Sequence, residues 1–153
     1  MVREAIPEDA AGIAIVLREL GWFEHIISEP ETVTIQRVLQ RLQLCNADQS
    51  HSVYVAEASD GHIMGYAGVH WLPTLYMKGI EGYVSELFIL EDERDQGVGT
   101  LLLDHIQLEA RNRGCYRLSL INMKGRESYH RQFYLKNGWE ERENAANFVL
   151  FLR

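Results

Sequence analysis

The segment from Tyr83 to Gly114 decides the fold of this chain: it reads YVSELFIL at 83–90, EDERDQGVGT at 91–100 and LLLDHIQLEARNRG at 101–114. The first part is a run of β-forming residues that is apolar on both faces, which predicts a buried, central strand. A charged turn then leads to Gly97 and Gly99. Apolar residues follow at helical spacing until Gly114 ends the helix. The segment therefore predicts a strand, a glycine turn and a helix in succession.

The turn between this strand and helix is suited to binding an anion. The first turn of a helix presents unpaired backbone N–H groups and the positive end of the helix dipole, and glycine lets a ligand approach closely. A phosphate is the expected ligand. Two common phosphate motifs do not fit, because GxxxxGK[ST] is absent and Leu102 stands where GxGxxG needs its third glycine. The alternative is a glycine turn that only feeds an ordinary amphipathic helix.

Length, charge and cysteine content narrow the class of protein. A chain of 153 residues suits one core, so we expect a single domain over 1–153. The net charge of −7, with no basic stripe, argues against a nucleic-acid partner and favours cationic partners such as amines. Cys45 and Cys115 lack motif spacing and are interpreted as buried thiols in a reducing compartment. No segment approaches the ~20 apolar residues that span a bilayer, so we expect a cytoplasmic protein without membrane contact.

The rest of the chain supplies strands and helices around the central unit. Turn signals and apolar periodicity predict one mixed sheet framed by a few helices. In the strand at 63–71, Gly65 and Gly68 indicate a bulge or a close backbone approach. The predicted strands are 2–6, 52–58, 63–71, 83–90, 117–121 and the return from Trp139 that includes 148–152, and the helices begin at Pro7, Glu31, Gly97 and Glu127.

Two separated motifs resemble those of the GNAT acyltransferase superfamily. Arg94-x-x-Gly97-x-Gly99 resembles the signature Q/R-x-x-G-x-G/A, which cradles the pyrophosphate of coenzyme A. The stretch FYLKNGW at 133–139 is similar to the family element A-x-x-[F/L]-Y-x-x-x-G-[F/W]. The order of elements matches as well, so the resemblance covers nearly the whole chain. It implies the GNAT fold, of α/β class and α+β type, with a central mixed, mostly antiparallel sheet of about six to seven strands flanked by about four helices.

The resemblance implies an N-acetyltransferase that moves an acetyl group from acetyl-CoA to a primary amine of a small molecule or a protein. By resemblance, the backbone of the central strand pairs with the pantetheine arm, and the N–H groups of the turn hold the pyrophosphate. The Asp95 carboxylate must then face away from the phosphates. A homodimer is left open, because exposed sheet edges often pair in this family. The expected cofactor-binding residues are Leu87, Phe88, Ile89, Arg94, Asp95, Gln96, Gly97, Val98, Gly99 and Thr100.

Acetyl transfer to an amine calls for a base and an acid, and the sequence offers one candidate for each role. Glu86 is the only carboxylate within the apolar run of the central strand, where burial would raise its pKa. By alternation we expect it to share a face with Val84, Phe88 and Leu90. A structural carboxylate paired with an arginine is the alternative. Tyr134 matches the family tyrosine and is the expected acid for the leaving thiolate, the alternative being a packed aromatic. Tyr129 and His130 could serve as backups.

Some residues depart from the family pattern, and the roles of others are not assigned by the motifs. Glu127 stands where many members have an asparagine that touches the coenzyme, so Lys124 or Arg126 is expected to meet phosphate instead. This departure keeps a second function open, a non-catalytic acyl-CoA sensor or interaction domain. By resemblance the segment at 22–26 lies over the acceptor pocket. The six histidines lack metal-ligand spacing, so no metal is expected.

Overall fold

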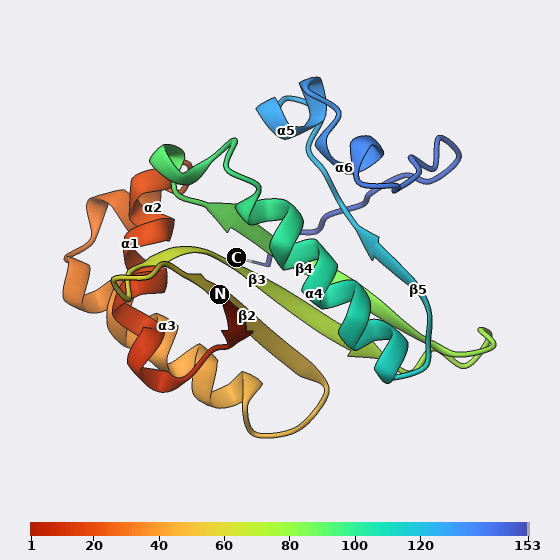
Figure 1. Cartoon of the computed structure of the whole chain (residues 1–153), viewed down its shortest axis with the longest axis horizontal. Coiled ribbons are helices and arrows are strands. Elements are labelled where there is room, and N and C mark those ends of the chain that lie inside the picture. The colour runs from red at the N-terminus through yellow and green to blue at the C-terminus, as the bar shows by residue number, and fades with distance from the viewer. Residues whose placement is uncertain (153) are drawn as a thin grey trace. The chain divides into compact units, whose positions relative to one another are not determined.

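The computed structural model describes residues 1–152, and they cluster into two compact units. The first runs from Met1 to Ile121 and holds the sheet, and the second begins at Asn122 (Figure 1). The strands are β1 (Val2–Glu4), β2 (His51–Glu57), β3 (Ile63–Leu72), β4 (Ile80–Ile89) and β5 (Cys115–Leu120).

The five strands form one sheet in the order β1-β2-β3-β4-β5. The first three pairings are antiparallel and β4 pairs with β5 in parallel, which confirms a mixed, mostly antiparallel sheet with the predicted central strand inside it. The predicted count of six to seven strands is wrong. The return from Trp139 forms no strand up to residue 152, because an apolar run becomes a strand only where a partner backbone supplies hydrogen bonds.

The described residues contain six α-helices instead of about four, of which three are long. The long ones match the predicted starts, but two short helices replace the single helix predicted at 127–136. The break falls at Gln132, whose φ of 58° lies in the left-handed region that ends a helix. The helices are α1 (Ala10–Leu20, after a 3-10 turn at Pro7–Asp9), α2 (Glu24–Ser28), α3 (Glu31–Cys45), α4 (Val98–Asn112), α5 (Glu127–His130) and α6 (Phe133–Lys136).

The long helices cover opposite faces of the sheet. α1 and α3 pack on the face that presents Val53, Val55 and Tyr66, and these side chains share one core with both helices. α4 packs on the other face, where Tyr54 meets His105 with ring centroids 4.7 Å apart. Alternation along a strand explains the division, since Tyr54 lies between Val53 and Val55 in β2.

A β-bulge in the middle of the sheet changes which residues share a face. Gly68 pairs with Glu86, but the next residue of β3, Val69, pairs with Val84, so Ser85 is the extra residue. Of the two alternatives expected for Gly65 and Gly68, a bulge is present beside Gly68, with its extra residue in β4. Because the alternation breaks there, Ser85 and Glu86 point to the same side, and the expectation that Glu86 shares a face with Val84 is wrong.

Candidate active site

The glycine turn has the conformation that an anion-binding helix start requires. Asp95 and Gly97 have φ of 61° and 81°, and Gly97 is the N-cap of α4. Gly97 has no side chain that could cap the first N–H groups of α4, and a helix leaves these groups without an intrahelical partner. A Cβ placed on Gly97 would meet no atom within 4 Å, which shows that the cradle is open to a ligand. These features fit a phosphate group.

The segment before this turn is braced from two sides. The Arg94 side chain donates from Nε to the carbonyl of Ile89 at 3.3 Å. His62, at the end of the β2-β3 hairpin, contacts Glu93 at 2.8 Å through Nε2 and Asp60 at 2.6 Å through Nδ1. The two carboxylates raise the pKa of His62, Asp60 having the larger effect. These contacts hold the segment that precedes the first N–H groups of α4.

Part of the central strand has an unpaired edge. Pairing of β4 with β5 runs from Ile80 to Val84 and then stops, whereas β4 keeps its pairing with β3 as far as Ile89. Beyond Val84, the backbone on the β5 side of β4 is therefore available to an added extended chain. The expected pantetheine-binding residues Leu87, Phe88 and Ile89 lie in this stretch.

Glu86 is a half-buried carboxylate at the bulge. Burial raises its pKa, and the hydroxyl of Tyr66, which donates a hydrogen bond to it, opposes that rise. Among residues 1–152, no ion pair includes Glu86, in contrast to Glu81 on the same strand, which pairs with Arg117 at 2.8 Å. The alternative of a strand carboxylate paired with an arginine therefore describes Glu81 and not Glu86.

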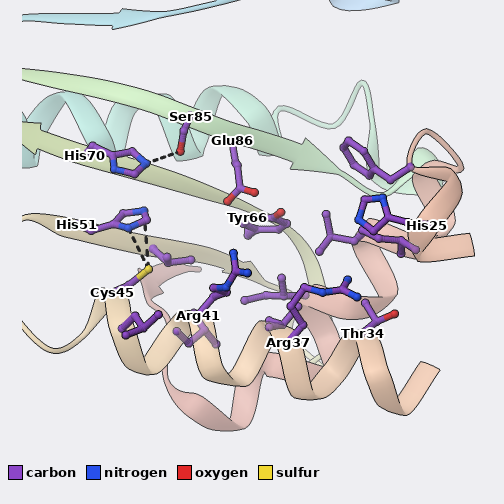
Figure 2. A pocket seen from close by; sticks show the side chains of 18 of the residues that line it. His25, Thr34, Arg37, Arg41, Cys45, His51, Tyr66, His70, Ser85 and Glu86 are labelled. Atoms are coloured by element: carbon purple, nitrogen blue, oxygen red, sulfur yellow. Dashed lines mark hydrogen bonds between the residues drawn. The ribbon is translucent and has the colours of Figure 1, made fainter. Parts of the chain in front are cut away.

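A pocket of about 720 Å³ opens between this face of the sheet and the helices α1, α2 and α3 (Figure 2). Glu86 and Ser85 belong to its sheet wall, together with Tyr66. From the segment predicted to cover the acceptor, the pocket includes Phe23 and His25 but not Trp22, which packs on Phe88. The polar and titratable lining residues are His25, Thr34, Arg37, Arg41, Cys45, Ser50, His51, Tyr66, His70, Ser85 and Glu86.

Two histidines stack side by side in the sheet wall of this pocket. The rings of His51 and His70 have centroids 3.9 Å apart. The Cys45 sulfur lies 3.0 Å from Nδ1 of His51, and Nε2 of His70 lies 2.9 Å from Oγ of Ser85. Burial lowers the pKa of His51 to about 4, with His70 adding to the effect, and burial also lowers the pKa of His70. Both rings are therefore neutral at physiological pH.

Sequence reasoning missed several of these residues. Arg37 and Arg41 stand four apart in α3, a spacing that places two side chains on one helix face and could have been noticed. Cys45 and His51 come together only because the chain turns back between α3 and β2, and no local pattern signals that contact. The apolar stripe of α3 indicates only the face that packs on the core.

Tyr134 belongs to the second unit and lies in α6. Its ring contacts Phe133 and Trp139, with centroids 5.0 Å and 5.9 Å apart. Burial raises its pKa to about 12, so its hydroxyl stays protonated over the physiological range. In the same unit, Nζ of Lys124 lies 3.4 Å from a carboxylate oxygen of Glu141. This ion pair involves the positive charge that was expected to bind phosphate.

No group of three or more histidine, cysteine or acidic side chains in residues 1–152 is arranged to hold a metal ion. Over the same residues, no helix combines the length and apolar character needed to cross a bilayer. Cys45 and Cys115 are both free thiols.

The fold and the glycine turn define a class of protein, a mixed α/β fold in which a glycine turn starts a helix beside a half-paired central strand. The chain belongs to the acetyltransferase (GNAT) family, whose model matches residues 17–139. A mouse thialysine N-epsilon-acetyltransferase is 25% identical over 129 residues, which are 79% of this chain and 74% of that protein.

Solved structures share the whole fold with this chain. A transcriptional regulator from Bacillus halodurans has a TM-score of 0.85 at 20% identity, with 99% of both chains covered. An aminoglycoside acetyltransferase from an uncultured soil sample has a TM-score of 0.79 at 17% identity, covering 100% of this chain and 96% of the other. These likenesses establish the GNAT fold.

Proposed function

We propose that this acetyltransferase transfers the acetyl group of acetyl-CoA to a primary amine by direct attack. The observation that carries the proposal is the bulge in β4, which places the Glu86 carboxyl in the wall of a pocket beside the unpaired edge of the same strand. Family membership supports acetyl-CoA as the donor, and the open cradle at Gly97 fits its phosphates. The backbone at 87–89 would hold the pantetheine arm.

In this mechanism the bond between the amine nitrogen and the acetyl carbon forms as the bond between carbon and sulfur breaks. An amine of pKa ~10 is unprotonated in only about one molecule in a thousand at neutral pH. Glu86 takes a proton from the attacking amine, directly or through a water, and its raised pKa suits that task. Tyr134 gives a proton to the leaving thiolate, so the products are the acetylamide and free coenzyme A.

We also propose that the protein is cytoplasmic. The free thiols of Cys45 and Cys115 support a reducing, cytoplasmic compartment, since oxidising compartments favour disulfides.

Release of free thiol from acetyl-CoA, followed across a panel of amines and peptides, tests this function. Thiol release that depends on an added amine is the expected result, with calorimetry of coenzyme binding as the companion measurement. Coenzyme binding without release for any amine would instead favour the acyl-CoA sensor. Absence of coenzyme binding would refute both functions.

Replacement of Tyr134 by phenylalanine is expected to lower kcat by roughly 10- to 100-fold or more, because the leaving thiolate loses its proton donor. Coenzyme affinity is expected to stay within a factor of two or so, since the proposed contact forms only as the thiolate departs. Steady-state kinetics and calorimetry measure the two quantities. Tyr116→Phe, at an exposed position in β5, is the matched control, and full activity of Tyr134→Phe would remove Tyr134 from the mechanism.

A further inference from the structure

Two arginines of α3 reach into the pocket, and only one of them is already neutralised. Arg37 donates from both terminal nitrogens to the carboxylate of Glu29, which also accepts a hydrogen bond from Thr34 at 2.7 Å. The positive charge of Arg37 is therefore balanced by Glu29. Arg41 lies one turn further along the same face of α3 and lines the same pocket.

Arg41 has no such partner. None of the ion pairs or hydrogen bonds between residues 1 and 152 includes its guanidinium. Figure 2 shows this side chain extending from α3 toward the sheet wall, on the side where Tyr66 and Glu86 project into the pocket. Arg41, Glu86 and the thiol of Cys45 all line this one pocket.

The other residues that line the pocket do not neutralise the positive charge of the Arg41 guanidinium. Glu86 is the one acidic side chain among the lining residues, and no ion pair within residues 1–152 joins its carboxyl to Arg41. His51 and His70 are held neutral by burial, so they contribute no opposing charge. The Arg41 guanidinium is therefore available to an anion, and at close range its charge outweighs the net negative charge of the chain, whose effect is screened over roughly 8 Å of salt solution.

We infer that the acceptor is a primary amine that also carries an anionic group, a carboxylate or a phosphate, which Arg41 binds while the amine faces Glu86. This inference rests on the proposed acetyl transfer and names the class of its acceptor. A guanidinium presents paired N–H donors that match both anions, and such charge-assisted bonds are stronger than neutral ones. Overall composition favours cationic partners such as amines, and the pocket narrows this class to amines that also carry an anionic group.

Matched pairs of amines that differ only in the anionic group test this inference. Amino acids are compared with their amides, and aminoalkyl phosphates with the corresponding amino alcohols. Each compound is assayed by thiol release and, separately, by calorimetric binding to the protein loaded with coenzyme A. The two kinds of pair distinguish a carboxylate from a phosphate.

We expect the wild-type protein to prefer the anionic member of at least one pair. Arg41→Gln should raise KM and Kd for that member by roughly 10- to 100-fold and leave the neutral member unchanged, as loss of charged hydrogen bonds predicts. Arg41→Lys should restore part of the preference. Arg111→Gln removes the same charge from α4, on the opposite face of the sheet, and should change neither constant. Thermal melting checks that each variant is folded.

Equal binding of both members of every pair, or binding of none, would overturn the inference, as would an anion preference that survives in Arg41→Gln. Failure of the proposed function has a different signature. Anion-dependent binding that Arg41→Gln abolishes, without any release of thiol, would retain the anion site and refute acetyl transfer. Thiol release that does not depend on the anionic group would support acetyl transfer and refute the anion site.

Discussion

Replacement of Glu86 by glutamine is expected to lower kcat for acetyl transfer by roughly 10²- to 10⁴-fold, the usual contribution of a general base. Glutamine keeps the size of the side chain and its hydrogen bonding with Tyr66 but cannot take a proton from the amine. Coenzyme affinity should be nearly unchanged, because the proposed coenzyme contacts on β4 come from its backbone. Steady-state thiol release and calorimetry measure these quantities.

The same substitution should not lower stability at neutral pH. Burial raises the pKa of Glu86 in the folded chain above its unfolded value, so the fold favours the protonated carboxyl. The stabilising contribution of this group is therefore present below the unfolded pKa, near ~4.3, and is lost as the pH rises through the folded pKa. A neutral glutamine avoids that loss, and the melting temperature at pH 7 should be equal or higher.

Glu81→Gln is the matched control on the same strand. Glu81 is buried and pairs with Arg117, so its loss should lower the melting temperature and leave kcat unchanged. Glu86→Gln should lower kcat but not the melting temperature, and Glu81→Gln should lower the melting temperature but not kcat. This contrast would distinguish a catalytic carboxylate from a structural one. If Glu86→Gln kept full activity, Glu86 would not be the base, and another group or a chain of waters would have to take the proton.

Gly97→Glu is expected to weaken coenzyme binding by about 100-fold or more. The new carboxylate would project into the open space of the cradle, where no atom lies within 4 Å of the added Cβ. Two like charges about 4 Å apart repel by about 4 kcal/mol at an effective dielectric constant near 20, which exceeds the effect predicted here. Isothermal calorimetry with coenzyme A measures the affinity directly.

Two variants at the same position separate charge from backbone strain. The φ of Gly97 is 81°, a conformation that costs any other residue about 1–2 kcal/mol in stability. Gly97→Ala and Gly97→Gln carry that strain without the charge, so both should melt earlier yet bind coenzyme more tightly than Gly97→Glu. Equal affinity of the glutamate and glutamine variants would show that the pyrophosphate does not lie at this turn.

Local patterns in the sequence predicted the elements that depend on local interactions. The helix Glu31–Cys45 begins at the predicted residue, and the glycine turn leads into α4 as expected. Such elements follow from apolar spacing, end signals and positive φ at glycine, all of which act within a few residues. The run at 148–152 shows the limit of this reasoning, because β-forming residues there found no strand partner in the described part of the chain.

The sequence by itself determined the strand, the glycine turn and the helix that follows it, and with them the resemblance to the family. Only the tertiary structure decided which side chains meet in the pocket. The bulge at Ser85 sets the direction of Glu86, and α3 carries Arg41 to the chamber that Glu86 also faces. The physical reason is that a bulge depends on the register between β3 and β4, and the pocket on the packing of α3 against the sheet. The register and the helix packing both depend on contacts between residues far apart in the chain, so no local spacing predicts them.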